Sequence, residues 1–394
     1  MDPSDFIDSQ FGAAVRRPGD RWAFTHYQPK PIPRSLTLPM HVVMALSEAD
    51  TALGNLAGLS TLITDPSTLI GPYLRREALA SSRIEGTQAS LSDLLQAEVD
   101  AQAGSDDVDE VRRYLDATDL AYRLSAELPI TQRLILEVHE TLLRGVRGEE
   151  KNPGAFRLTP VWVGHAGATP ETATYVPPLP DEIGALLTDW ERFVNEPAPT
   201  LPVLVHAAMM HYQFETIHPF LDGNGRIGRL LINVILKERG RLPHPLLYLS
   251  SYFEAHRQEY YAALQGVRER GDIDSWLHFF LHAVTEQAND GVARSKRLIG
   301  IREGYRARVA QDRSRLPALV ELIVHNPFLT VRSVQAALEV TNQGARNLIR
   351  RAEDQGFVRS LGTFGRGGRE TWLAQEVFDV LEAPMLYADP PALD

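Results

Sequence analysis

The segment His218-Pro219-Phe220-Leu221-Asp222-Gly223-Asn224-Gly225-Arg226-Ile227-Gly228-Arg229 decides what fold and chemistry we expect of this chain. Proline disfavours the α conformation in the residue before it, so Pro219 predicts a loop position for His218. Gly223 and Gly225 allow tight turns and the close approach of a ligand to the backbone. A histidine beside such a cradle suits general-base chemistry, because its ordinary pKa is about 6.5.

The second half of the segment predicts an anion site. Asn224 tolerates unusual backbone angles, and a helix is expected from Gly225 to Arg239, whose first N–H groups would face an anion. Arg226 and Arg229 place two cations at the positive end of that helix, which is unfavourable unless an anion binds there. A single carboxylate, Asp222, suits Mg²⁺, which takes one or two carboxylates together with substrate phosphates. A capped helix with solvated arginines explains each residue alone, but not the whole set.

The segment resembles the Fic-family signature HPFx(D/E)GNGRxxR and matches all nine of its defined positions. The preceding run, 204–217, is also similar to the family. The resemblance implies a mainly α fold, with a helical core, an inserted β-hairpin flap, an N-terminal helical extension and a C-terminal winged helix. It implies transfer of AMP from ATP to a Tyr, Thr or Ser hydroxyl of a target protein or of the chain itself. Related folds transfer phosphate, UMP or phosphocholine, but the phosphate-transferring branch departs from the GNGR part that this sequence keeps.

The same resemblance assigns roles to the residues of the segment. His218 would deprotonate the target hydroxyl, and Asp222 would hold Mg²⁺ on the α- and β-phosphates of ATP. The phosphate contacts would come from Gly223, Asn224, Gly225, Arg226 on the β side and Arg229 on the γ-phosphate. Pyrophosphate would be the leaving group.

A second motif precedes the core. Ser81 and Glu85 lie four residues apart on one helix face, and Glu85 faces the negative end of the helix dipole just before Gly86. This placement suggests a cationic partner elsewhere in the fold. The stretch resembles the family's inhibitory pattern (S/T)xxxE(G/N), which implies that Glu85 pairs with Arg229 and blocks the γ-phosphate. An exposed glutamate at a helix end is the alternative explanation.

Two further regions are assigned through the resemblance. The β-rich stretch 161–176, with Val161, Trp162, Val163 and Tyr175, would be the flap that docks an extended target segment by main-chain hydrogen bonds. Ser251, Tyr252, Tyr260 and Tyr261 follow the motif helix, and Tyr252 and Tyr260 are the candidates for walling the adenine. A surface hairpin and core packing, respectively, are the alternatives.

The C-terminal part predicts a winged helix. Three short helices are expected at 316–327, 330–338 and 341–355, with Thr330 and Thr341 as N-caps, followed by a wing around 362–368. From Thr341 to Ala374 there are six arginines (346, 350, 351, 359, 366 and 369) against three acids (353, 354 and 370), which favours DNA contact modestly. Protein docking or dimerisation through this domain stays open.

These elements divide the chain into six expected parts. They are an arm with one short strand (1–38), a helical region with the inhibitory motif (39–124), the Fic core (125–293), a linker (294–315), the winged helix (316–376) and a tail (377–394).

Composition sets the outer limits of the function. The formal net charge of −11 argues against non-specific nucleic-acid binding by the whole surface, and the lack of cysteine excludes thiolate zinc sites and a cysteine nucleophile. No apolar run predicts a membrane span, and the N-terminus does not resemble a secretory signal, so we expect a cytoplasmic protein. The expected partners are ATP, Mg²⁺ and a protein target, with DNA and a second copy of the chain left open. Alternatives to adenylyl transfer are AMP removal, a bifunctional enzyme, and a DNA-binding regulator whose core senses nucleotide.

Overall fold

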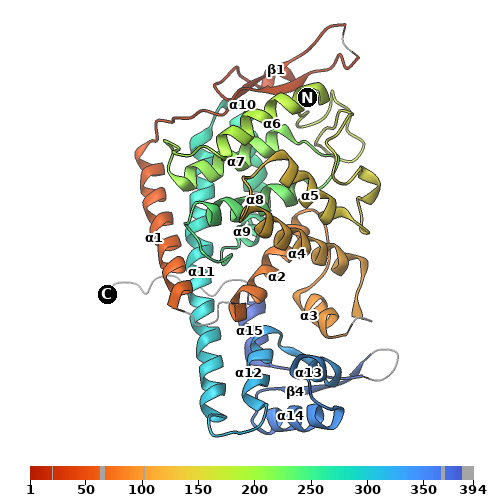
Figure 1. The fold of residues 1–394 in the computed structure, drawn as a ribbon. Helices are drawn as coiled ribbons and strands as arrows, with labels where there is room; N and C mark the ends of the chain where they lie inside the picture. Colours follow the sequence, from red (N-terminus) through yellow and green to blue (C-terminus); the bar gives the residue numbers. More distant parts are fainter. Residues whose placement is uncertain (20, 63–66, 101–102, 365–368, 384–394) are drawn as a thin grey trace.

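A computed structural model describes residues 1–394 apart from 20, 63–66, 101–102, 365–368 and 384–394. The described chain is mainly helical with two small antiparallel sheets, which confirms the predicted fold class (Figure 1). The helices before the C-terminal part are α1 (Met40–Leu62), α2 (Ser67–Ile84), α3 (Leu91–Val99), α4 (Asp106–Ser125), α5 (Gln132–Leu143), α6 (Ile183–Val194), α7 (Val203–Ile217), α8 (Asn224–Glu238), α9 (Leu249–Ala255), α10 (Arg257–Arg270) and α11 (Ile273–Arg308). No described helix combines the length and apolar character that crossing a membrane requires.

Helix α7 lies at the centre of the core. Its residues 204–217 are all buried, and α6, α8 and α11 pack around it. Two tryptophans of neighbouring helices donate their indole N–H groups to α7 carbonyls, Trp190 to Met210 at 3.0 Å and Trp276 to Ala208 at 3.1 Å. The motif loop follows directly after α7, so the fixed position of this helix also fixes the start of the loop.

The N-terminal arm contains two strands, where the sequence predicted one. Strand β1 (Gly12–Val15) pairs antiparallel with β2 (His26–Pro29), because the chain between them turns back and gives β1 a partner. Tyr27 of β2 donates its backbone N–H to Val176 at 2.8 Å, and its ring lies against that of Tyr175. The arm is therefore attached to the base of the predicted flap.

The flap is less regular than the predicted β-hairpin. Val163 and Tyr175 form one antiparallel bridge pair, with N–H···O bonds of 2.8 and 3.1 Å between their backbones. Turns occupy the residues between them, and prolines at positions 170, 177 and 178 remove donors that a longer ladder would need.

The predicted linker 294–315 is largely helical. Helix α11 continues without a break to Arg308 and is about 54 Å long at 1.5 Å per residue. Its charged second half is tied into the structure because Arg294 is buried against Asp290, while Leu298 and Tyr305 face inward. Only residues 309–315 remain as a connection to the part that follows.

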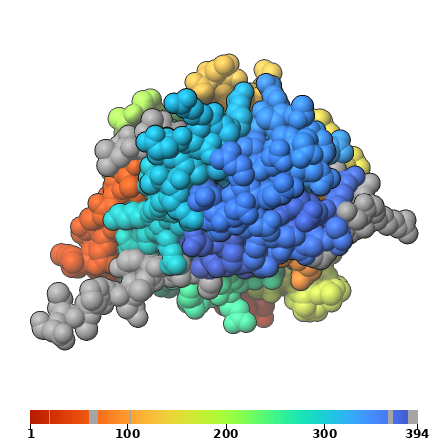
Figure 2. Space-filling model, turned by 90° about the horizontal axis from the view of Figure 1, so that it is seen from below, coloured from red at the N-terminus to blue at the C-terminus, as the bar shows by residue number. Residues whose placement is uncertain are grey.

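Residues 316–382 form a unit that we call the C-terminal block, at the lower end of the molecule in Figure 1 and facing the viewer in Figure 2. Its elements are α12 (Leu316–His325), β3 (Phe328–Thr330), α13 (Val331–Leu338), α14 (Asn342–Asp354), β4 (Arg359–Phe364), β5 (Arg369–Leu373) and α15 (Gln375–Glu382). The sheet has the order β3-β5-β4.

The predicted helix caps of this block are confirmed, whereas the predicted start of the tail is not. Thr330 and Thr341 cap α13 and α14 as predicted, accepting hydrogen bonds from Ser333 N (3.0 Å) and Gly344 N (3.1 Å). The tail predicted from residue 377 instead begins within α15, which buries four apolar side chains (Val377, Phe378, Val380 and Leu381). Residues 365–368 of the predicted wing, including Arg366, and residues 384–394 lie outside the described residues.

Candidate active site

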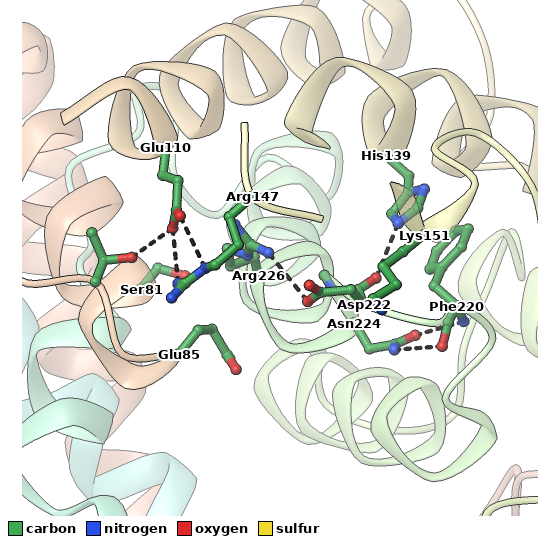
Figure 3. Close-up of polar contacts among 12 residues, drawn as sticks. Ser81, Glu85, Glu110, His139, Arg147, Lys151, Phe220, Asp222, Asn224 and Arg226 are labelled. Carbon is green, nitrogen blue, oxygen red and sulfur yellow. Dashed lines mark hydrogen bonds and ion pairs between the residues drawn. The ribbon is translucent and has the colours of Figure 1, made fainter. Parts of the chain in front are cut away.

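The motif loop joins α7 to α8 through two left-handed residues. His218 ends α7 with φ 51°, and Gly223 precedes α8 with φ 78°. The Asn224 side chain closes the loop between them, because its Oδ1 accepts from Phe220 N (2.8 Å) and its Nδ2 donates to Phe220 O (3.0 Å). Asn224 was predicted to assist in phosphate binding; the structure shows its amide occupied in bracing the loop (Figure 3).

His218 is held in its neutral form. Burial, and then the positive charges of Arg157 and Arg268, lower the pKa of His218 to about 4. The backbone carbonyl of Glu215 opposes this shift by accepting a hydrogen bond from the ring. A neutral imidazole keeps one ring nitrogen unprotonated, and that nitrogen can accept a proton.

Asp222 lies at the open side of the loop, with its side chain 38% exposed. Its Oδ1 accepts from Gly223 N (2.5 Å) and from Arg226 Nη2 (3.3 Å), while no hydrogen bond reaches Oδ2 from any residue that the structure describes. The described residues contain no cluster of three or more metal-ligating side chains. One available carboxylate oxygen beside an anion site fits Mg²⁺ bound jointly with phosphates, and does not fit an all-protein metal site.

The two motif arginines, both almost fully buried, differ in how their donors are used. Arg226 donates to Asp222 through Nη2, but its Nε and Nη1 have no partner within the described part of the chain. Arg229 donates Nε to Ser81 Oγ (3.0 Å) and Nη2 to both Ser81 O (2.8 Å) and Glu85 Oε1 (2.7 Å). A buried guanidinium with open donors is an anion site, so Arg226 is ready for a ligand whereas Arg229 is occupied.

The Glu85 carboxylate is ionised and lies directly on the motif backbone. Burial opposes its ionisation, but the Arg229 guanidinium outweighs this and holds the pKa of Glu85 below its usual range. A Cβ atom added to Gly225 would lie 2.3 Å from Glu85 Oε1, so only glycine lets the carboxylate occupy this place. Gly86 has φ 103°, which ends α2 in a turn that other residues rarely adopt.

Three residues that the sequence did not reveal fix the turn after Glu85. Thr87 Oγ1 donates to Glu110 Oε2 (2.8 Å) from within this turn, and Arg147 closes the group with two 3.0 Å contacts to the same carboxylate. Figure 3 shows Arg147 next to Arg226. Glu110 is an acidic residue on the face of α4 that is buried. An acidic residue at such a position indicates a polar partner, and this could have been recognised from the sequence.

His139 is a further residue that sequence reasoning missed. Its Nδ1 accepts from Gly154 N (3.0 Å), so the proton lies on Nε2, which donates to the Asp222 carbonyl (3.0 Å; Figure 3). The ring stacks on Phe220 at 3.7 Å. Burial lowers the pKa of His139 to about 4, which keeps this tautomer neutral. His139 occupies a position of its helix where the pattern predicts a buried core residue. The sequence therefore did not indicate that this histidine contacts the motif loop.

The two predicted adenine-wall tyrosines differ in their surroundings. Tyr260 is buried, and its hydroxyl is hydrogen-bonded to His211 Nε2 at 2.8 Å, so its ring packs in the core. Tyr252 lines a separate cavity with His41 and His282. The charges of both Glu85 and Arg229 act on Tyr260 and on its neighbour Tyr261, of which Tyr261 is 43% exposed.

The flap residues divide into a buried and an exposed set. Tyr175 is buried and donates to Thr216 O (2.5 Å), so its role is structural. Trp162 and Val163 are 43% and 44% exposed, and Val161 is half-buried, which leaves this strand accessible to an extended segment. Arg157 joins the flap to the motif by donating to His218 O (2.8 Å) and Pro178 O (2.6 Å).

Comparisons with known proteins match the two motif-bearing regions. Residues 43–123 match the Fic/DOC family N-terminal model, and residues 129–236 match the Fic/DOC family model. The protein adenylyltransferases Fic of Drosophila grimshawi and Culex quinquefasciatus are each 34% identical over 173 residues, or 44% of this chain. The matched part covers 31% and 30% of those proteins, so the chain spans about a third of the length of these relatives.

Solved structures show the same fold. A Fic family protein from Desulfovibrio desulfuricans G20 superposes with a TM-score of 0.56 at 19% identity, covering 87% of this chain and 98% of that one. Fic-1 from C. elegans (residues 134–508) superposes with a TM-score of 0.50 at 22% identity, covering 65% and 74%, respectively.

Replacing Asn224 should show how much its two hydrogen bonds to the Phe220 backbone stabilise the loop. We expect Asn224→Ala to lower the free energy of unfolding by about 2 kcal/mol, since it leaves two buried backbone groups unpaired. Asn233→Ala is the matched control, because Asn233 lies on the same helix, is also buried, and its Oδ1 has no partner among the described residues. Urea unfolding measures both, and equal losses would contradict a specific role for these two hydrogen bonds.

Proposed function

Residues 43 to 236 of this chain belong to the Fic/DOC family, and on this premise we propose that the chain is an autoinhibited protein adenylyltransferase. It would transfer AMP from ATP to a hydroxyl side chain of a protein target or of itself. The observation that carries the proposal is the contrast between the two buried arginines, one with open donors and the other closed by Glu85 and Ser81.

The residues of the loop suggest how the transfer would proceed. The target hydroxyl oxygen forms a bond to the α-phosphorus, the bond from that phosphorus to the bridging oxygen breaks, and pyrophosphate leaves. The hydroxyl proton passes to the unprotonated ring nitrogen of His218. Two cations help to depress the pKa of this histidine in the free protein, so a bound triphosphate would offset their charge and make it a stronger base.

Arg226 and the first N–H groups of α8 would bind the phosphates directly. Asp222 would bind them through Mg²⁺. Arg226 offers Nε and Nη1, and the helix N-terminus adds its partial positive charge. Bound Mg²⁺ would supply neutralisation of the phosphate charge, with Asp222 Oδ2 as its protein ligand. The exposed strand at Trp162 and Val163 would hold an extended segment of the target.

Inhibition would act through Arg229. Its Nε and Nη2 donors already serve Ser81 and Glu85, so a γ-phosphate would have to compete with these groups for Arg229. ATP would then bind with its α-phosphate out of line with the attacking hydroxyl. Removal of AMP from a modified protein is the alternative role of Glu85, in which its carboxylate would position a water molecule.

His218→Ala should reduce AMP transfer by about 10²–10⁴, because it removes the general base, while ATP affinity stays nearly unchanged. His165→Ala is the matched control, since His165 is an exposed histidine of the flap loop. Single-turnover transfer of labelled AMP and equilibrium ATP binding give the two readouts. Near-native transfer by His218→Ala would remove this residue from the proposed role.

Glu85→Gly should raise AMP transfer by at least about tenfold, the factor that corresponds to ~1.4 kcal/mol, because Arg229 is then free for the γ-phosphate. Arg229→Ala should not raise it, since that change removes the phosphate ligand itself. Glu254→Gln is the control, because Glu254 faces α2 through Arg83 and not through Arg229. Unchanged labelling in Glu85→Gly would contradict the inhibitory role.

A second assay separates inhibition from AMP removal. Pre-labelled protein is incubated with the wild type and Mg²⁺, and released AMP is measured. Release that disappears in Glu85→Gly would establish removal; no release together with faster labelling in the variant would establish inhibition alone.

The C-terminal block is proposed to be a winged helix with α14 as its recognition helix. Of its cations, Arg351 pairs with Asp312 and Arg369 with Asp100, whereas Arg346 and Arg350 are exposed on α14. Replacing Arg346 and Arg350 by Ala should weaken DNA binding in a gel-shift titration at low salt. No binding by the wild type would favour protein docking, and a homodimer stays a prediction.

A further inference from the structure

The helix that carries the inhibitory motif also carries an attachment of the C-terminal block. The last turn of α2 presents Ser81 to the active site, while α2 also packs against α12 of the block. Gly71 shows how close this packing is, since an added Cβ atom would lie 2.9 Å from the His325 ring. Figure 1 shows α2 reaching from the core down to the block.

Arg76 of α2 and Arg294 of α11 together hold the end of α15. Arg76 Nη1 donates to the carbonyls of Leu381 and Ala383, and Arg294 donates to those of Val380 and Ala383. Burial, and then the charge of Arg294, lowers the pKa of Arg76 to about 10. The buried guanidinium of Arg294 and the partly buried one of Arg76 need negative charge, and the C-terminus of α15 supplies part of it. The position of Arg76 therefore depends on α15.

Arg75 makes a second attachment from the next position of α2. It forms a paired contact with Glu98 of α3 (2.6 and 2.9 Å) and donates to His325 O at 3.4 Å. Asn326 closes the same group by donating to Leu95 O (3.1 Å) and Glu98 Oε2 (2.9 Å). The block is thus hydrogen-bonded to α2, before the inhibitory motif in the sequence, and to α3, after it.

The chain between these two attachments includes Glu85, and a shift of α2 at Arg76 would also move Glu85. Arg76 and Glu85 are nine residues apart, about 14 Å along a helix, with no break between them before α2 ends at Ile84. A cavity of about 410 Å³ lies beside this stretch, between α2, α9 and α15, and gives the helix room to shift. A small displacement of α2 is enough to separate Glu85 Oε1 from Arg229 Nη2, which lie 2.7 Å apart.

We propose that Arg75 and Arg76 are positioning residues for Glu85. Through these two arginines, the C-terminal block would set how strongly Glu85 inhibits AMP transfer. This inference rests on the proposed inhibitory role of Glu85. Displacement of the block, by whatever it binds, would loosen α2, release Arg229 for the γ-phosphate and raise AMP transfer. The block thereby regulates the active site without contacting ATP.

The test uses the full-length chain with Arg76→Gln and, independently, Asn326→Ala. Both should raise single-turnover AMP transfer by about fivefold or more, and neither should raise it further in a Glu85→Gly background. Arg76→Lys, which keeps a donor for the carbonyls of α15, should restore most of the inhibition. Arg302→Gln is the matched control, because it breaks a 2.7 Å ion pair between α11 and α12 of the block without touching α2.

Hydrogen exchange provides a readout that does not depend on activity. The amides of Glu85, Gly86 and Thr87 are bonded to Ser82 and Arg83 carbonyls at 3.0–3.2 Å, so they should exchange faster in Arg76→Gln than in Arg302→Gln. Native exchange at these amides in a folded Arg76→Gln protein, or equal acceleration of transfer with and without Glu85, would overturn the inference. If Glu85→Gly itself leaves transfer unchanged, the proposed inhibition fails, and faster exchange would still establish the mechanical link.

Discussion

The ion pair between the buried Arg229 and the partly exposed Glu85 is the interaction on which the arrangement of the site depends. Arg229 stands in the first turns of α8, where the helix dipole is positive, and is almost fully removed from water. A cation in such a place needs immediate counter-charge, and Glu85 supplies it from just beyond the end of α2, where an anion is equally misplaced. Each charge offsets the other's unfavourable position, so two segments 144 residues apart in the sequence are fixed against each other.

Arg229 has further acidic neighbours that are not fully committed. Burial raises the pKa of both Glu77 and Glu215 to about 7, and the charge of Arg229 works against that rise in each case. Glu77 is bonded to Ser250 N at 3.1 Å, whereas Glu215 Oε1 has no hydrogen-bond partner among the described residues. The charge of Glu85 adds to the raised pKa of Glu215, so loss of Glu85 would favour the ionised form of Glu215.

The sequence predicted the parts of the site that depend on local geometry. The loop position of His218, the helix that starts beside Gly225 and the threonine caps follow from neighbours a few residues away. The contact from Glu85 to Arg229 came from the family resemblance and from two misplaced charges, and the structure places the two side chains 2.7 Å apart. The role of Tyr260 at the adenine stays a prediction, because an aromatic residue after the motif helix has the same pattern whether it packs in the core or lines a pocket. The contacts of His139 and Arg157 join loops that are distant in sequence, and no local pattern encodes them.

Helix α2 therefore takes part in two kinds of charged contact, one near its middle and one at its C-terminal end. At one end, carbonyl and hydroxyl groups of Ser81 and the carboxylate of Glu85 surround a buried arginine of the active site. Near the middle of α2, the partly buried Arg76 donates to two carbonyl groups of the C-terminal block. Buried charges tolerate little displacement, because separation from their partners leaves them unsolvated. Because α2 continues without a break from Arg76 to Ile84, a shift of the helix at the block is transmitted to the residues that hold Arg229.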